Sequence, residues 1–209
     1  MKFTSESFPD GGAIPPHHAF CMPDPGGRIK AGQNRNPQLA WSELPAGSLS
    51  VVLICHDPDV PSQPDDVNQQ GRTIPASLPR VNFVHWVLID MPASGSPIRD
   101  GEFSSGVTVK GKSGPLAPRN TRQGLNDYTA WFKNDEKMAG DYFGYDGPCP
   151  PWNDEIAHRY VFTLFALDLE TCPVQRKFTA AHVMKAMQGH ILGTAQITGR
   201  YSLNAAVKV

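Results

Sequence analysis

The sequence predicts a mainly β protein, because helix-breaking residues are frequent and the apolar stretches are short. The 209 residues include 20 prolines and 19 glycines, which divide the chain into short segments. The apolar runs are bounded by Pro, Gly or Asp, as expected for the strands of a sheet. One segment alone has the three- and four-residue spacing of an amphipathic helix.

Four apolar runs are the expected strands. In chain order they are Gln38–Trp41, Leu49–Cys55, Asn82–Ile89 and Arg159–Leu167. The last three are apolar along both alternating sets of positions, so we expect each of them to be buried on both faces of a sheet. The expected core positions are Val52, Ile54, Val87, Ile89, Val161, Thr163 and Phe165.

The expected helix begins near Thr179, a residue type that commonly caps a helix N-terminus, and is interrupted at Gly189. Its apolar positions are Val183, Met184, Met187 and Ile191. We expect a second short helical turn at Ile191–Ile197 and a last strand at Arg200–Leu203.

Length and charge set the class of protein. The chain can hold one sizeable core and shows no break in composition, so we expect a single domain over residues 1–209. A formal charge of −1 disfavours nucleic acid and acidic membrane surfaces as partners. No window approaches the roughly 18 apolar residues of a membrane span, and the N-terminus has no long apolar segment. We therefore expect a cytoplasmic protein without integral membrane association.

The cysteines Cys21, Cys55, Cys149 and Cys172 are scattered, with no C-x-x-C pair. This spacing predicts neither a disulfide framework nor a zinc finger. Cys55 stands in an apolar run and is expected to be a core residue, whereas Cys149 lies between prolines.

Two long segments are expected to be loops, at Ser62–Arg80 and Lys110–Gly147. Loops of this length in a compact domain are usually functional or mobile. The second contains five aromatic residues, which either anchor the loop to the sheet or form a partner-binding face. They are Trp131, Phe132, Tyr142, Phe143 and Tyr145.

Polar residues stand against the predicted strands and suggest a small ligand pocket at the rim of the sheet. They occur in DPDVP at Asp57–Pro61, in FVHWVLID at Phe83–Asp90, and from Gly147 onward in GPCPPWND…HRY. Each motif also has a structural explanation, since Asp-Pro-Asp often forms a turn and a histidine in an apolar strand is often a satisfied core residue. The remaining histidines, expected to be surface, structural or helix-contact residues, are His17, His18, His56, His182 and His190.

Taken together, these motifs resemble the phosphatidylethanolamine-binding protein family, in its bacterial branch of Raf-kinase-inhibitor-like proteins. The resemblance runs from FPDGGAIP through NRNPQLAW, DPDVP, FVHWVLIDMPAS, RQGLNDY and YDGPCPPWND to HRYVFTLFALD and GHILGTAQITGRYS. It implies a two-sheet antiparallel Greek-key β-sandwich with a few peripheral short helices. It also implies a cis peptide bond at Val60–Pro61 and, as in bacterial relatives, a homodimer.

The resemblance further implies a small anion pocket at one end of the sandwich. Matched position by position, the ligand-binding residues are Asp57, Asp59, His85, Gly147, Pro148, Pro150, His158 and Tyr160. Histidine can donate a charge-assisted N–H to a phosphoryl oxygen when a carboxylate orients it, and Tyr160 can add a hydroxyl donor.

The chain departs from the family pattern by two apparent insertions, about residues 63–81 and 131–141, which we expect at the pocket mouth. Only eight residues follow Tyr201, so the C-terminal helix of animal members is expected to be absent.

The sequence therefore predicts a protein that binds a small anion, phosphate or a phosphorylated head group, in a regulatory or scaffold role, with no cofactor. An alternative is a phosphoester hydrolase or lyase that uses His85 and His158, and another is a kinase or protease inhibitor acting through the inserted loops. We assign no catalytic residue, because Ser62 and Cys149 lack an activating motif. Nor do we assign a metal ligand, since the Asp57, Asp59, His85 and His158 spacing is not a ligand motif.

Overall fold

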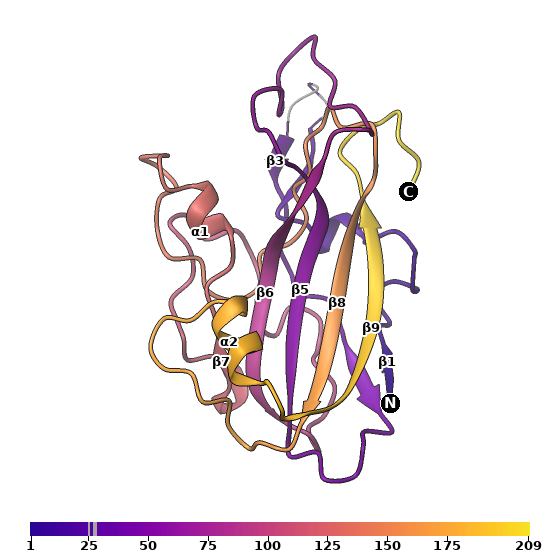
Figure 1. Cartoon of the computed structure of the whole chain (residues 1–209). Helices are drawn as coiled ribbons and strands as arrows, with labels where there is room; N and C mark the ends of the chain where they lie inside the picture. Colours follow the sequence, from indigo (N-terminus) through magenta and orange to yellow (C-terminus); the bar gives the residue numbers. More distant parts are fainter. Residues whose placement is uncertain (25, 27–28) are drawn as a thin grey trace.

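The computed structural model describes residues 1–24, 26 and 29–209. Its main element is a five-stranded antiparallel sheet in the order β7-β6-β5-β8-β9 (Figure 1). The strands are β5 (Ser50–Pro61), β6 (Arg80–Pro92), β7 (Arg122–Gln123), β8 (His158–Leu167) and β9 (Ile191–Tyr201). Strands β5, β6 and β7 are consecutive neighbours, and β8 returns to lie beside β5, which is the strand order of a Greek key. The predicted mainly β, antiparallel Greek-key fold is confirmed.

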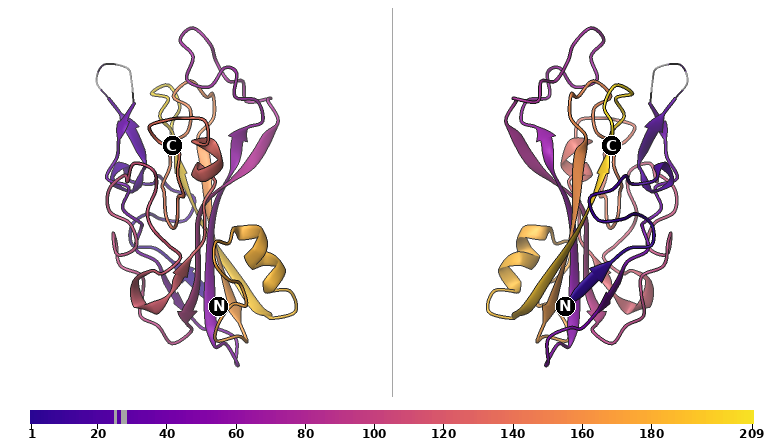
Figure 2. Two further views of the ribbon diagram at one scale, coloured as in Figure 1. Left: turned by 90° about the vertical axis from the view of Figure 1, so that its left-hand side faces the viewer. Right: turned by 90° about the vertical axis from the view of Figure 1, so that its right-hand side faces the viewer.

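Two small antiparallel sheets and a few short helices complete the structure. The first pairs β1 (Lys2–Thr4) with β4 (Ala40–Ser42), and the second pairs β2 (Cys21–Pro23) with β3 (Ile29–Ala31). The helices are η1 (Pro16–His18), η2 (Pro118–Asn120), α1 (Tyr128–Trp131) and α2 (Ala180–Ala186). Seen along its edge, the large sheet carries α2 on one face and the small sheets on the other (Figure 2). Within the described residues, no helix has the length and apolar character needed to cross a membrane.

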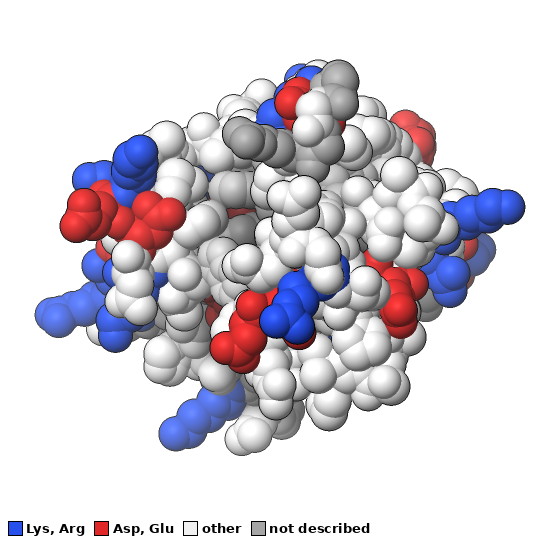
Figure 3. All heavy atoms as spheres, turned by 90° about the horizontal axis from the view of Figure 1, so that it is seen from above, with Lys and Arg blue, Asp and Glu red and all other residues white. Residues whose placement is uncertain are grey.

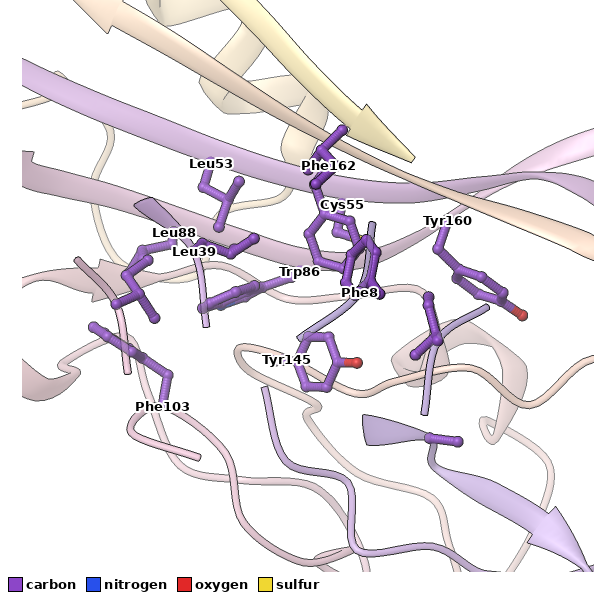
Figure 4. Close-up of a cluster of buried hydrophobic side chains, with 14 of the residues drawn as sticks. Phe8, Leu39, Leu53, Cys55, Trp86, Leu88, Phe103, Tyr145, Tyr160 and Phe162 are labelled. Atoms are coloured by element: carbon purple, nitrogen blue, oxygen red, sulfur yellow. The ribbon is translucent and has the colours of Figure 1, made fainter. Parts of the chain in front are cut away.

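The central strands are buried on both faces, as their apolar pattern predicts. Toward the small sheets, one face packs a cluster that includes Leu53, Cys55, Trp86, Leu88 and Phe162 (Figure 4). The opposite face packs against α2 through Val52, Ile54, Val87, Ile89, Val183 and Met187. Thr163 is buried, and Val161 and Phe165 are half-buried. Since successive side chains of a strand point to opposite faces, a continuous apolar run supplies both clusters.

The helix expected at Thr179 is confirmed as α2. Thr179 is its N-cap residue, and its backbone N–H donates a hydrogen bond to His182 Nδ1 at 3.2 Å. The second helical turn, expected at Ile191–Ile197, is wrong. These residues open the edge strand β9, which pairs with β8 from Ile191 opposite Leu167 to Tyr201 opposite His158. Cross-strand hydrogen bonding over the whole length of β8 outweighs the weak strand propensity of Gly193 and Ala195.

The expected cis bond at Val60–Pro61 is also wrong. Among the described residues, the cis peptide bond is Gly114–Pro115. The DPDVP motif does not turn the chain, because β5 continues through it and pairs Val60 with Val81 and Pro61 with Arg80. A turn is therefore not the explanation of this motif.

Candidate functional site

A cavity of about 280 Å³ lies at the end of the large sheet where β5 ends and β8 begins. Its polar lining comes from Asp57, His85, Asn68, His158 and Tyr160. The rest of the lining is mainly apolar, from Phe20, Cys21, Ile29, Val60, Pro61, Pro64, Val67, Phe83, Tyr128, Trp131, Phe132, Cys149, Pro150 and Pro151. A mostly apolar hollow with a few polar groups is the usual form of a small-molecule site.

His158, in the cavity wall, is held between two carboxylates. Its Nδ1 lies 2.7 Å from Asp57 Oδ2 and its Nε2 lies 3.1 Å from Asp154 Oδ2. Burial alone lowers the pKa of His158, but the hydrogen bonds to Asp154 and Asp57 raise it to about 9. The ring is therefore an imidazolium at neutral pH, and both of its N–H groups donate to carboxylates.

Arg80 extends this chain of charges. Its guanidinium holds Asp154 in two hydrogen bonds, of 2.5 Å and 3.0 Å. Burial raises the pKa of Asp154, but the bonds from His158 and Arg80 outweigh burial and hold it below its usual range. The four groups Asp57, His158, Asp154 and Arg80 have opposite charges in alternation, so together they carry no net charge.

Asp59 does not line the cavity. Its backbone N–H donates to Asp57 Oδ1 at 2.7 Å, and its carboxylate accepts Arg159 Nε at 2.8 Å and a terminal guanidinium nitrogen at 2.7 Å. The pairing of β5 with β6 has a register shift between Asp57 and Val60, at the point where the two aspartates take different partners. Asp57 thus orients His158, while Asp59 ties β5 to β8.

His85 and Tyr160 retain unused polar atoms at the cavity. The His85 Nδ1 lies 2.7 Å from the Asp146 carbonyl, to which it must donate, so Nε2 carries the lone pair of the neutral ring. Burial lowers the pKa of His85 despite the nearby carboxylates. The buried Tyr160 hydroxyl has no partner at hydrogen-bond length, although burial and the nearby Asp57 carboxylate both raise its pKa. Its ring lies 5.1 Å from that of His85 between centroids. Figure 4 shows Tyr160 at one side of the core cluster.

Aromatic rings form one wall of the cavity. Phe20 stacks on Tyr128 at 4.6 Å between ring centroids, and Tyr128 stacks on Phe132 at 5.6 Å. Phe83 meets Tyr128 edge-on at 5.1 Å. The Tyr128 hydroxyl donates to the Gly147 carbonyl at 3.0 Å, which fixes the ring. This wall can cover the apolar part of a bound molecule.

Both apparently inserted segments border the cavity, as expected. The first supplies Pro64, Val67 and Asn68, and the second supplies Trp131 and Phe132. Asn153 fixes the first segment, because its side-chain nitrogen donates to the carbonyls of Asp66 at 2.8 Å and Arg72 at 3.1 Å, and its oxygen accepts the Asn68 N–H at 3.0 Å. In the second long segment, Tyr142, Phe143 and Tyr145 are buried and anchor it to the core, while Trp131 is half-exposed.

Gly147 and Pro148 support the wall without lining it. A Cβ at Gly147 would lie 2.1 Å from the His18 carbonyl oxygen, so a larger residue cannot fit. The Pro148 carbonyl accepts the N–H groups of Phe20 and Cys21. Of the eight predicted residues, those on the cavity surface are Asp57, His85, Pro150, His158 and Tyr160.

A disulfide joins Cys21 and Cys149 in the cavity wall, with 4.8 Å between the Cα atoms. The cysteine spacing did not predict this single bond, because the two cysteines are 128 residues apart and meet only in the fold. Disulfides persist in oxidising compartments, so this bond does not favour the cytoplasmic location, which stays a prediction. Cys55 and Cys172 are free and buried, and burial raises the pKa of both thiols.

Charged groups of both signs are interspersed with uncharged surface on the end of the molecule at the top of Figure 1 (Figure 3). Recognition of an anion at this end would therefore depend on individual donors rather than on a large positive field.

Comparison with known proteins places these observations among relatives. A family model described as phosphatidylethanolamine-binding protein matches residues 4–202. The UPF0098 protein YbhB of Escherichia coli is 31% identical over 202 residues, which cover 97% of this chain and 100% of that protein. A UPF0098 protein of Methanothermobacter thermautotrophicus is 28% identical and covers 96% of this chain and 98% of its own length. The crystal structure of E. coli YbcL, described as a member of the mammalian PEBP family, matches with a TM-score of 0.66 and 25% identity, over 96% of this chain and 97% of that one.

Proposed function

Because the chain belongs to the phosphatidylethanolamine-binding protein family, in the branch of E. coli YbhB and YbcL, we propose that its cavity binds a small anion. The ligand class is phosphate or a phosphorylated head group. The observation that carries the proposal is the buried Tyr160 hydroxyl, which lines the cavity without a hydrogen-bond partner. A buried hydroxyl left unpaired costs about 1–3 kcal/mol, and a ligand oxygen would remove this cost.

The donors for the anion are the Tyr160 hydroxyl and, once protonated, His85 Nε2. His158 has a different role from the one expected, since both of its N–H groups already donate to Asp57 and Asp154. It is a positioning residue that fixes Asp57 at the cavity wall. Because the charges around His158 balance, an incoming anion gains its positive partner by proton uptake on His85.

The apolar wall supports a ligand that has more than a phosphoryl group. Phe20, Tyr128 and Phe132 form a stacked surface, and the two long segments add Val67 and Trp131 at the mouth. A phosphorylated head group with a carbon chain would place its anionic end at Tyr160 and its chain on this wall. Inorganic phosphate would occupy only the region at Tyr160.

Removal of the Tyr160 hydroxyl is the direct test. Titration calorimetry with O-phosphorylethanolamine, inorganic phosphate and sulfate compares the parent with Tyr160→Phe. Loss of one hydrogen bond to an anion should weaken binding by about tenfold or more. The matched control is Tyr142→Phe, whose hydroxyl instead donates to the Met138 carbonyl outside the cavity. Equal affinities of the parent and Tyr160→Phe would overturn the proposal.

The pH dependence of binding tests the role of His85, provided that protonation of the ligand is kept apart from protonation of the ring. If binding requires protonated His85, affinity falls by up to about tenfold per pH unit between the pKa values of the free and the bound ring. Sulfate is the probe for this measurement because it stays fully charged throughout, whereas phosphate itself titrates near neutral pH. A flat profile for sulfate would remove His85 from the site.

Hydrolysis of a phosphoester by His85 and His158 is the alternative that the same residues suggest. A general base has to release and accept protons near the working pH, and the pKa of His158 is raised to about 9 with both nitrogens engaged. This favours binding without turnover. Incubation with phosphomonoesters tests it, since product that is lost in His85→Ala would support the enzyme.

The regulatory or scaffold role and the homodimer stay predictions. Inhibition of a partner through the inserted segments would appear as protein capture that is lost when residues 63–80 are deleted, and light scattering of the purified chain would measure its oligomeric state.

A further inference from the structure

Two adjacent histidines and an aspartate meet away from the cavity. His17 and His18 belong to η1, and Asp100 lies in the turn that follows Ile98, on a distant stretch of the chain. The Asp100 Oδ2 is 3.6 Å from His17 Nε2 and 3.9 Å from His18 Nε2. One ligand atom from each of the three residues lies within 4.8 Å of the other two. None of them lines the cavity of the proposed function.

His18 has an orphaned nitrogen that points to a missing partner. Its side chain is fully buried, and Nδ1 lies 2.9 Å from the Arg35 carbonyl, to which it must donate. The neutral ring therefore carries its lone pair on Nε2, which is buried and has no hydrogen-bond partner. A ring held through one nitrogen by a carbonyl, with the other nitrogen free, is the usual arrangement of a metal-ligating histidine.

Protonation of His18 Nε2 would not give this nitrogen a hydrogen-bond partner. At 3.9 Å, the separation of His18 Nε2 and Asp100 Oδ2 exceeds hydrogen-bond length. By contrast, a metal ion lies between its ligands, about 2.0–2.2 Å from each nitrogen and oxygen, so ligand atoms of one tetrahedral ion stand about 3.3 Å apart. The observed separations need a modest contraction. His17 and Asp100 can provide it, because their side chains are 40% and 35% exposed, whereas His18 is fully buried.

Asp100 is held with one oxygen free. Arg35 Nε donates to Asp100 Oδ1 at 2.6 Å, and Oδ2 is the oxygen nearer to both histidines. Gly101, with a φ of +71°, keeps the neighbouring backbone clear, since a Cβ there would lie 3.0 Å from the Arg35 guanidinium carbon. A ligating carboxylate that is itself hydrogen-bonded is typical of metal sites. The Arg35 charge opposes a cation, but its partner is the oxygen that does not face the histidines.

The donor set selects the class of ion. Imidazole suits Zn²⁺, Cu²⁺, Ni²⁺ and Fe²⁺, whereas Mg²⁺ and Ca²⁺ prefer oxygen ligands alone. We propose that His17, His18 and Asp100 form a surface site for a divalent transition metal, with Zn²⁺ as the ion that fits best. Two imidazoles and one carboxylate leave the fourth tetrahedral position to water, because His17 and Asp100 both reach the surface.

The test is a calorimetric titration with Zn²⁺. The untagged protein is first treated with a chelator to remove any bound metal. We expect one Zn²⁺ per chain in the parent, no binding of Mg²⁺, and a loss of affinity by about 100-fold in His17→Ala. His17→Ala should fold normally because its side chain is partly exposed. The matched control is His190→Ala, an exposed histidine that pairs with Asp168 elsewhere and should bind Zn²⁺ like the parent.

Substitution of Co²⁺ adds a readout of geometry, since a tetrahedral site gives intense visible absorption that should disappear in His17→Ala and in Asp100→Asn. Two results would overturn the proposal. One is the absence of stoichiometric Zn²⁺ binding by the parent, and the other is binding that His17→Ala and Asp100→Asn leave unchanged, which would place the ion elsewhere. Neither result would contradict the anion proposal, which depends on Tyr160.

Discussion

Two fully buried histidines of this protein differ in what surrounds their ring nitrogens. His158 has a carboxylate on each nitrogen, and the two bonds raise its pKa to about 9. His18 has a backbone carbonyl on one nitrogen and nothing on the other, and burial lowers its pKa. Both side chains are closed to solvent, so the hydrogen-bond partners and the neighbouring charges decide whether the ring is charged.

The difference separates structural histidines from candidate ligands. The ring of His158 is satisfied and acts as a cation that holds two buried carboxylates together. Among the described residues, the buried side-chain atoms without a partner are His18 Nε2 and the Tyr160 hydroxyl. Each of our two proposals rests on one of these atoms, because buried polar groups are normally paired and an exception calls for an explanation.

The largest difference in the free energy of unfolding should appear when each of the two histidines is replaced, in separate variants, by glutamine. His158→Gln leaves Asp57 and Asp154 buried with no cation between them, which should lower the free energy of unfolding by about 3–5 kcal/mol. His18→Gln loses one neutral hydrogen bond and some packing, and should cost no more than about 2 kcal/mol. Urea unfolding of both variants measures the difference. Equal costs would mean that the two rings are held alike.

A smaller change in the free energy of unfolding is expected when the pH is raised. The folded-state pKa of His158 is about 9, above the usual 6.5, so its stabilising contribution is fully present below about pH 6.5 and is lost as the pH rises to about 9. Across this window the free energy of unfolding should fall by about 3 kcal/mol. Urea unfolding at several pH values measures this slope, and His158→Gln should lack most of it. A parent curve that is flat above pH 6.5 would show that Asp57 and Asp154 do not hold a charged ring.

The three central strands and the start of α2 could be predicted from the sequence because they depend on local patterns. Apolar runs identify buried strands, and Thr179 marks a helix start through its own side-chain chemistry. The predicted last strand at Arg200–Leu203 overlaps only the end of β9. The first part of β9 could not be recognised in this way, since residues 191–197 include glycine, alanine and threonine and gain their structure from pairing with β8.

Local sequence patterns predicted some residues of the candidate site and missed others. His85 and Tyr160 lie on predicted strands, and Asp57 and His158 stand just outside the predicted bounds. All four belong to the motifs that resemble the family, so their approach could be expected. Asp154 and Arg80 could not, because both stand at the ends of loops whose course the sequence does not specify. The Cys21–Cys149 disulfide and the neighbours of His18 likewise join stretches that are far apart in the chain.

The smallest effect should come from an aspartate that faces a histidine without binding it. In the metal-free protein, Asp100→Asn should change the free energy of unfolding by about 1 kcal/mol or less. Its side chain is 35% exposed, its Oδ2 is beyond hydrogen-bond length from both histidines, and asparagine retains an oxygen for Arg35 Nε. Asp57→Asn is the matched variant at His158 and should cost clearly more, because it removes a buried charge that is 2.7 Å from an imidazolium. Urea unfolding with a chelator present compares them. If Asp100→Asn cost as much as Asp57→Asn, His18 would be charged and paired as His158 is, and its Nε2 would not be free for a metal.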